Sequence, residues 1–285
     1  MKWLVITFGL VWAAAAEAYV AERATFDHDG RERAYYFYAP VGADDTTPLL
    51  IALHGMGGNA RNLRFGIGLT EAAADAGFAV VYPQGVRLPD GSRHWNAGFD
   101  FLDVNDVGYL NDLARALIAE HGLSSKKVMI LGISMGGFMA YHMACKSSLP
   151  IAGIVVVAGS IHPSDFDHCA SGQRPSLLHI HGRLDPLVPF YGHSHWSLPG
   201  KPPVSVPDIV ADWAAAAHAR RVQATLSGDA IEQTRFVNPQ DGIEVQLLEL
   251  TAFGHDWPSE ATAGYRALDD IIAFLVRQRD AWAAR

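Results

Sequence analysis

Apolar and polar positions follow a regular pattern along this chain. Short apolar runs, bounded by Gly, Pro or Asp, occur at 35–38, 49–53, 79–82, 128–131, 154–157, 177–181 and 245–250. These runs predict strands, most of them buried on both faces. Apolar residues recur at helical spacing in the segments 70–76, 107–121, 135–145, 209–220 and 267–276. The alternation predicts an α/β fold with a mostly parallel central sheet and helices on both faces.

The first 18 residues have the pattern of a secretory signal. Met1-Lys2 is followed by an apolar stretch over 3–16 and by Ala16-Glu17-Ala18, which ends in a small residue. We expect cleavage after Ala18 and a secreted protein, extracellular or periplasmic. The alternative is a membrane anchor, but 3–16 is shorter than the roughly 20 residues that cross a bilayer. No later stretch is long enough, so we expect no membrane span in the mature chain.

Composition is typical of a globular protein, with 49% hydrophobic and 18% charged residues. No repeat or low-complexity linker divides residues 19–285, which are predicted to form a single domain. The Pro-rich stretch 198–207 is interpreted as a surface excursion. The net charge is −8, and Lys and Arg are scattered rather than gathered into a stripe. Nucleic acid and other phosphate-rich partners are therefore not expected, and no obligate protein partner is implied.

The chain has two cysteines, Cys145 and Cys169. In an exported protein an even number of cysteines favours a disulfide, which over so short a loop would contribute about 3 kcal/mol. Two separate buried thiols are the alternative.

The residues 132–136 read Gly-Ile-Ser-Met-Gly, after a β-branched apolar run and before a helical segment. A serine on so tight a strand-to-helix turn has an exposed hydroxyl, and the flanking glycines let the two backbones approach. The position predicts that Ser134 is a nucleophile. The alternative is a structural turn in which Ser134 caps the helix.

A serine hydroxyl is a weak nucleophile, so it needs a histidine base that a carboxylate orients. Asp185 follows the strand at 177–181, in a Pro-stiffened loop, at the strand end where site residues gather in such sheets. His255 lies in a turn-rich loop between the last predicted strand and the closing helix. The order serine, acid, histidine is that of α/β-hydrolases.

Other polar residues are weaker candidates. His193 and His195 suggest a metal site, but no nearby carboxylate or cysteine set completes one, so we predict no metal. Asp256 is adjacent to His255 and would fold back onto its ring with difficulty. Asp167 and Asp208 are placed less favourably still.

Residues 53–60 read Leu-His-Gly-Met-Gly-Gly-Asn-Ala and follow the strand at 49–53. Glycines free the backbone to aim amide N–H groups at a tetrahedral oxyanion. We assign the two donors to the backbone of Met56 and of Met135. A generic glycine-rich turn is the alternative for the first.

Seven motifs are spread over nearly the whole mature chain. They are His54-Gly55-x-Gly57-Gly58-Asn59, Tyr82-Pro83-x-Gly85, Trp95-Asn96-Ala97-Gly98, Asp106-Val107-Gly108, the 132–136 turn, Asp185-x-x-Val188-Pro189 and Gly254-His255-x-Trp257-Pro258. Together they resemble the secreted polyhydroxybutyrate depolymerase and feruloyl or acetylxylan esterase type of α/β-hydrolase. The resemblance implies Ser134, Asp185 and His255 as the catalytic triad, in agreement with the reasoning above.

The resemblance also suggests that Trp95 and Trp257 line the cleft, with plain core packing as the alternative for each. Ala252-Phe253 replaces the glycine-rich stretch usual before the family's histidine, so Phe253 is expected to narrow the cleft. No adsorption domain for solid polyester is visible, which favours soluble oligomers or small esters.

The residues therefore predict a single catalytic domain over 19–285 that hydrolyses carboxylic esters through an acyl-enzyme, without a cofactor. Hydroxyalkanoate oligomers, feruloyl esters and acetyl esters are the expected substrates. A serine peptidase of the same fold is the alternative enzyme, because the fold alone does not decide the reaction. A non-catalytic binding protein is the alternative from another class.

Overall fold

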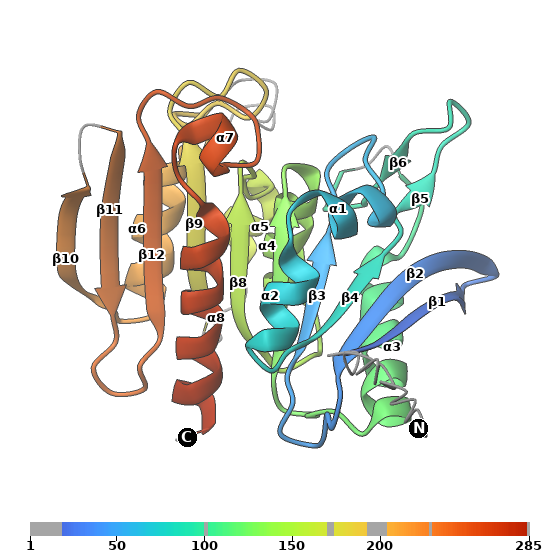
Figure 1. Cartoon of the computed structure of the whole chain (residues 1–285). Coiled ribbons are helices and arrows are strands. Elements are labelled where there is room, and N and C mark those ends of the chain that lie inside the picture. The colour runs from blue at the N-terminus through green and yellow to red at the C-terminus, as the bar shows by residue number, and fades with distance from the viewer. Residues whose placement is uncertain (1–18, 100–101, 170–173, 193–203, 228–229, 284–285) are drawn as a thin grey trace, which may run out of the picture.

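The central sheet is the main feature of the computed structural model, which describes residues 19–99, 102–169, 174–192, 204–227 and 230–283 (Figure 1). In spatial order its strands are β1 (Tyr19–His28), β2 (Arg31–Pro40), β4 (Ala79–Pro83), β3 (Leu49–Leu53), β7 (Val128–Ile133), β8 (Ile151–Val157), β9 (Ser176–Gly182), β12 (Glu244–Leu250), β11 (Ile231–Val237) and β10 (Arg220–Ser227). A separate hairpin consists of β5 (Val86–Arg87) and β6 (Arg93–His94). The helices are α1 (Ala60–Gly66), α2 (Leu69–Asp75), α3 (Asp106–His121), α4 (Met135–Lys146), α5 (Pro163–His168), α6 (Val206–Ala216), α7 (Glu260–Ala263) and α8 (Ala267–Ala283).

The middle of the sheet is parallel. The strands from β4 through β3, β7, β8 and β9 to β12 all run in the same direction. Antiparallel strands flank them, β1 and β2 at one edge and β10 and β11 at the other. The predicted mostly parallel sheet is confirmed. Because the carboxyl ends of parallel strands meet at one edge, the loops after β3, β7, β9 and β12 gather there.

Both faces of the sheet are buried, and each has its own hydrophobic core. In β3, Leu49, Ile51 and Leu53 pack into the core that contains residues of α3, α4 and α6. Leu50 and Ala52 alternate with them and pack into the core with α1, α2 and α8 (Figure 1). This explains why the strand has a continuous apolar run, since period-two side chains meet apolar neighbours on both sides.

The structure corrects the prediction for the edge of the sheet that contains β10 and β11. The helix predicted over 209–220 ends at Ala216, and Arg220 already belongs to β10. His218 takes a left-handed φ of 50°, and the Ala219 N–H bonds back to the Ala214 carbonyl, so the helix stops there. The β10–β11 hairpin was not predicted, because its mixed polar sequence has no continuous apolar run.

The two cysteines are bonded. Cys145, in the last turn of α4, forms a disulfide with Cys169, which follows α5. The predicted bridge is therefore confirmed. It attaches α5 to α4, the helix that follows Ser134.

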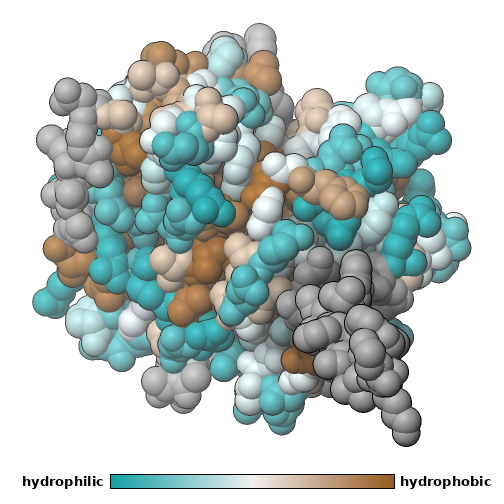
Figure 2. All heavy atoms as spheres, viewed as in Figure 1, coloured by the Kyte–Doolittle hydropathy of each residue, from teal (hydrophilic) through white to brown (hydrophobic). Residues whose placement is uncertain are grey.

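The predicted signal at 1–18 lies outside the described residues. Within the described ranges no helix is long and apolar enough to cross a membrane. On the coloured part of the face in Figure 2, apolar residues form separate patches among polar ones.

Candidate active site

Ser134 lies on a strained turn between β7 and α4. Its φ of 53° and ψ of −118° are unusual for a residue with a side chain. The Ser134 N–H donates to the Val157 carbonyl at 2.9 Å, which fastens the turn to the end of β8. The turn thus holds the hydroxyl above the edge of the sheet, as the sequence predicts.

The two glycines of the turn are required by close backbone contacts. A Cβ atom on Gly132 would lie 2.0 Å from the Gly136 carbonyl oxygen. A Cβ on Gly136 would lie 2.2 Å from the Leu53 carbonyl oxygen. Strand β7, helix α4 and the end of β3 therefore meet at distances that only glycine allows.

The structure brings Asp185 and His255 to Ser134. Asp185 lies in the loop after β9, and His255 lies in the loop after β12. The His255 Nε2 is 3.0 Å from the Ser134 Oγ, and its Nδ1 is 2.7 Å from the Asp185 Oδ2. In this geometry Nδ1 donates to the carboxylate, and Nε2 is left to accept the serine proton.

Asp185 is a buried carboxylate with four hydrogen-bond donors. The N–H groups of Leu187 and Val188 donate to its Oδ1 at 2.9 and 2.8 Å. Its Oδ2 lies 2.7 Å from the Nδ1 of His255 and 3.2 Å from the Nε2 of His181. Burial acts to raise the pKa of Asp185, but the bonds from His181, His255 and the Val188 N–H outweigh it and hold the pKa well below its usual range.

A chain of buried hydrogen bonds continues behind Asp185. The His181 Nε2 also lies 2.8 Å from the Val188 carbonyl, which only accepts, so this nitrogen carries the proton. His181 Nδ1 then accepts from His179 Nε2 at 3.0 Å, and His179 Nδ1 accepts from the Tyr141 hydroxyl at 2.8 Å. We call Tyr141, His179 and His181 the histidine relay.

Burial keeps His179 and Tyr141 of the relay neutral. It lowers the pKa of His179 well below the ordinary value, and the neighbouring His181 lowers it further. It also raises the pKa of Tyr141 well above the ordinary value. His179 and His181 had no role predicted from the sequence beyond their place in the predicted strand at 177–181. The available signal was two histidines, two residues apart, on one face of a fully buried strand.

The predicted oxyanion donors border the cleft. Met135 is the first residue of α4, where the helix leaves its N–H without an internal partner. In the preceding loop, the Gly57 N–H donates to the Arg93 carbonyl and the Gly58 N–H donates to the Gly55 carbonyl. Among the described backbone hydrogen bonds none uses the Met56 N–H. The role of the Met56 N–H as an oxyanion donor stays a prediction.

His54 fixes the base of that loop. Its Nδ1 donates to the Gly55 carbonyl at 2.8 Å, and its Nε2 accepts from the Gly85 N–H at 3.0 Å. Burial lowers the pKa of His54 to about 4, so the ring is neutral near pH 7. Trp95 donates its Nε1 hydrogen to the His54 carbonyl at 2.9 Å.

The prediction that two tryptophans line the cleft is wrong for one of them. Trp95 is fully buried in the hydrophobic core and does not line the cleft, so the packing alternative holds for it. Trp257 does line the cleft. Phe253 packs against the other core and is absent from the lining, so the expected narrowing is wrong.

The cleft that contains Ser134 and His255 has a volume of about 510 Å³. Most of its wall is apolar, formed by Met56, Ile133, Phe138, Leu187, Val188 and Trp257. A volume of this size suits a small organic group. The apolar wall favours an acyl or aryl substituent over a charged one.

The weaker candidates from the sequence take no part in the contacts among Ser134, His255 and Asp185. Asp256 reaches the cleft edge, but its carboxylate accepts from the Trp257 N–H. Asp208 bonds with the Ser205 that caps α6. His193 and His195 lie outside the described residues, as does the side chain of Asp167. Within the described ranges no group of His, Cys, Asp and Glu is arranged to hold a metal.

A parallel sheet with a serine turn after one strand, an acid after another and a histidine after the last defines the α/β-hydrolase class. The chain belongs to the phospholipase/carboxylesterase family, whose model matches residues 40–196, more than half of its length. The predicted resemblance to α/β-hydrolase esterases is thereby confirmed.

Individual relatives agree with this assignment. NocK of Nocardia uniformis subsp. tsuyamanensis, which bears an esterase name, is 31% identical over 83% of this chain and 74% of its own length. Feruloyl esterase B of Thermothelomyces thermophilus is 28% identical over 58% of this chain and 55% of its own. The solved acetyl xylan esterase of Aspergillus awamori, with 17% identity and a TM-score of 0.64, covers 90% of this chain and 98% of its own, and supports the fold. The protein is an esterase.

Proposed function

We propose that this esterase is a secreted serine hydrolase that cleaves small or oligomeric carboxylic esters through an acyl-enzyme. The observation that carries the proposal is the contact of His255 with Ser134 at 3.0 Å and with Asp185 at 2.7 Å, beside an apolar cleft. These distances are within hydrogen-bond reach for general base catalysis.

The reaction follows from the polarity of these contacts. The Ser134 Oγ attacks the ester carbonyl while His255 Nε2 takes the hydroxyl proton. Asp185 stabilises the imidazolium that forms, and the backbone N–H groups of Met56 and Met135 donate to the oxyanion. His255 then gives its proton to the departing alcohol, which leaves an acyl-Ser134. Water, deprotonated by His255, attacks this ester, and His255 returns the proton to the Ser134 Oγ as the acid leaves.

The substrate class is proposed from the cleft and from the relatives. An apolar cleft of about 510 Å³ accepts the acyl part of a small ester or the end of an oligomer. Relatives named for feruloyl and acetylxylan ester hydrolysis support aryl and acetyl groups as candidates. Hydroxyalkanoate oligomers are retained because of the motifs described above.

A panel of esters tests the proposal. The purified chain is assayed on nitrophenyl acetate, nitrophenyl butyrate, methyl ferulate and hydroxybutyrate oligomers, with matched amides beside them. We expect ester turnover that falls on the order of 10⁴-fold or more in Ser134→Ala. Ser148→Ala is the control, because Ser148 lies beyond the opposite end of α4 and bonds with Arg115.

The outcomes separate the alternatives. Amide cleavage as fast as ester cleavage would favour a peptidase. No turnover by folded protein, together with failure of Ser134 to react with a fluorophosphonate, would favour a binding protein. Export has its own test: the secreted fraction of cells that express the full chain is expected to begin at Tyr19 on N-terminal sequencing, and a retained 1–18 segment would contradict it.

A further inference from the structure

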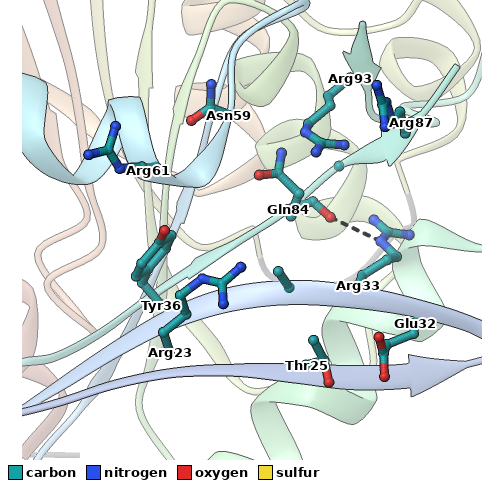
Figure 3. Close-up of a pocket in the computed structure, with 12 residues that line it drawn as sticks. Arg23, Thr25, Glu32, Arg33, Tyr36, Asn59, Arg61, Gln84, Arg87 and Arg93 are labelled. Carbon is teal, nitrogen blue, oxygen red and sulfur yellow. Dashed lines mark hydrogen bonds between the residues drawn. The ribbon is translucent and has the colours of Figure 1, made fainter. Parts of the chain in front are cut away.

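A second pocket, lined by arginines, shares no lining residue with the catalytic cleft (Figure 3). Its volume is about 560 Å³, comparable to that of the catalytic cleft. Side chains from β1, β2, the start of α1 and the β5–β6 hairpin surround it. We call it the arginine pocket, after its lining residues Arg23, Arg33, Arg61, Arg87 and Arg93.

One of these arginines is already neutralised. Arg33 is buried and paired with the buried carboxylate of Asp106, and its Nε donates to the Gln84 carbonyl at 3.0 Å. The other four make no ion pair within the described residues. Glu32 is the acidic residue that lines the pocket. The pocket therefore has an excess of positive charge, although the chain carries a net charge of −8.

The pairing of β5 with β6 adds to this excess. Arg87 and Arg93 stand directly opposite each other across the two-residue hairpin. Like charges at directly opposed positions destabilise a strand pair. A bound anion between the two guanidinium groups would reverse that repulsion, since each offers a fork of donors that fits a carboxylate or phosphate.

We propose that the arginine pocket binds a small multivalent anion that carries two or more carboxylate or phosphate groups. Arg61, Arg87 and Arg93 supply the positive charges that bind the anion. Arg23, on β1, lines the pocket as well (Figure 3). The pocket volume matches a small molecule rather than a nucleic acid strand. Sequence reasoning expected no phosphate-rich partner because these arginines are dispersed over 23–93, and the fold brings them together.

The pocket also touches the backbone that supports the predicted oxyanion loop. The Arg93 carbonyl accepts the Gly57 N–H at 2.9 Å, and the Gln84 Nε2 lies 3.1 Å from the His54 Nε2. Both Arg93 and Gln84 line the pocket. An anion held there would therefore contact residues that bond directly to this loop.

Calorimetric titration of the purified chain tests the proposal at constant ionic strength, with pyrophosphate and citrate as probes and acetate as the monovalent control. We expect saturable binding of at least one multivalent probe, and much weaker binding of acetate. The tighter of the two probes identifies phosphate or carboxylate as the preferred group. Arg61→Gln, Arg87→Gln and Arg93→Gln are each expected to weaken that binding about tenfold, the loss of one charge-assisted hydrogen bond.

Arg115→Gln is the matched control, because it removes the same charge from the surface of α3, where Arg115 bonds with Ser148 and Asp112. Equal weakening by Arg115→Gln would overturn the proposal, since it would show attraction to overall charge. No heat of binding with either probe in the millimolar range would also overturn it. Thermal unfolding checks that each variant folds, and the readout is independent of ester turnover.

Discussion

His181 is predicted to position the catalytic carboxylate, and two conservative substitutions separate this role from packing. In His181→Gln the side-chain amide reaches about as far as the Nε2 and keeps a donor for Asp185. In His181→Asn the shorter side-chain amide reaches only as far as the Nδ1 of the histidine. It therefore keeps the acceptor for His179 and loses the donor to Asp185. Both variants are polar and similar in size, so they differ mainly in the bond at 3.2 Å to the Asp185 Oδ2.

The expected losses of kcat and of stability in His181→Asn follow from the hydrogen bonds around Asp185. A hydrogen bond to a charged group contributes about 1.5–3 kcal/mol, and about 1.4 kcal/mol corresponds to a factor of ten. Three donors remain in His181→Asn, namely His255 and the N–H groups of Leu187 and Val188. We therefore expect kcat to fall about tenfold and the free energy of unfolding to fall by about 2 kcal/mol. KM should change little, because His181 does not line the cleft.

The assay is steady-state hydrolysis of a nitrophenyl ester, with urea unfolding of the same samples. His181→Gln is expected to retain most of the kcat that His181→Asn loses. Equal kcat in the two variants would refute the reasoning, because their difference isolates the bond to Asp185. A rise in KM without a fall in kcat would show that His181 shapes the cleft instead.

Three further perturbations test the scaffold of the site. Gly136→Ala should lower the free energy of unfolding by about 3 kcal/mol in urea, whereas Gly66→Ala, whose Cβ meets open space, should change it by less than about 1 kcal/mol. His54 binds its proton less readily when folded, with a pKa of about 4 against 6.5 for the ordinary side chain. The unfolded chain therefore takes up the extra proton first, and stability should fall by about 3 kcal/mol as the pH drops between these values, but less in His54→Gln, as measured by urea unfolding at both limits. Replacing Cys145 and Cys169 by Ser should lower the free energy of unfolding by about 3 kcal/mol, and an unchanged urea midpoint would contradict this.

The fold was predictable where hydrophobic pattern and burial coincide. The strands β3, β4 and β7 are fully or almost fully buried, and their apolar runs identify them within a residue or two. The two antiparallel strands at the β10 edge of the sheet were not predictable in this way. β11 is half-buried along its whole length, so its side chains carry no strong apolar signal, and its pairing with both β12 and β10 fixes it as a strand.

The candidate site likewise has residues whose role could be predicted from the sequence and one whose role could not. The Ser134 turn has a local cause, the contacts that demand Gly132 and Gly136, and this cause is visible in the sequence. Asp185 and His255 follow from the strand ends and the order of the chain. The prediction for Trp95 was wrong because a tryptophan in a motif looks the same in the sequence whether its indole faces a substrate or donates to a buried carbonyl.

The histidine relay and the arginine pocket escaped prediction for a common reason, since each is made by neighbours that the chain keeps apart. Tyr141 on α4 reaches His179 because α4 packs against β7 and β8 on the side of the sheet where Leu177 of β9 joins the same core. Arg23 and Arg93 line one pocket because β1 and the β5–β6 hairpin border the same space. The relay places polar groups in the core, where they cost free energy unless a partner meets them. In the relay the partners are present, and they end at Asp185. In the arginine pocket the lining residues that the structure describes include five arginines and one acidic residue, Glu32, and this excess of positive charge is the ground for the proposed anion.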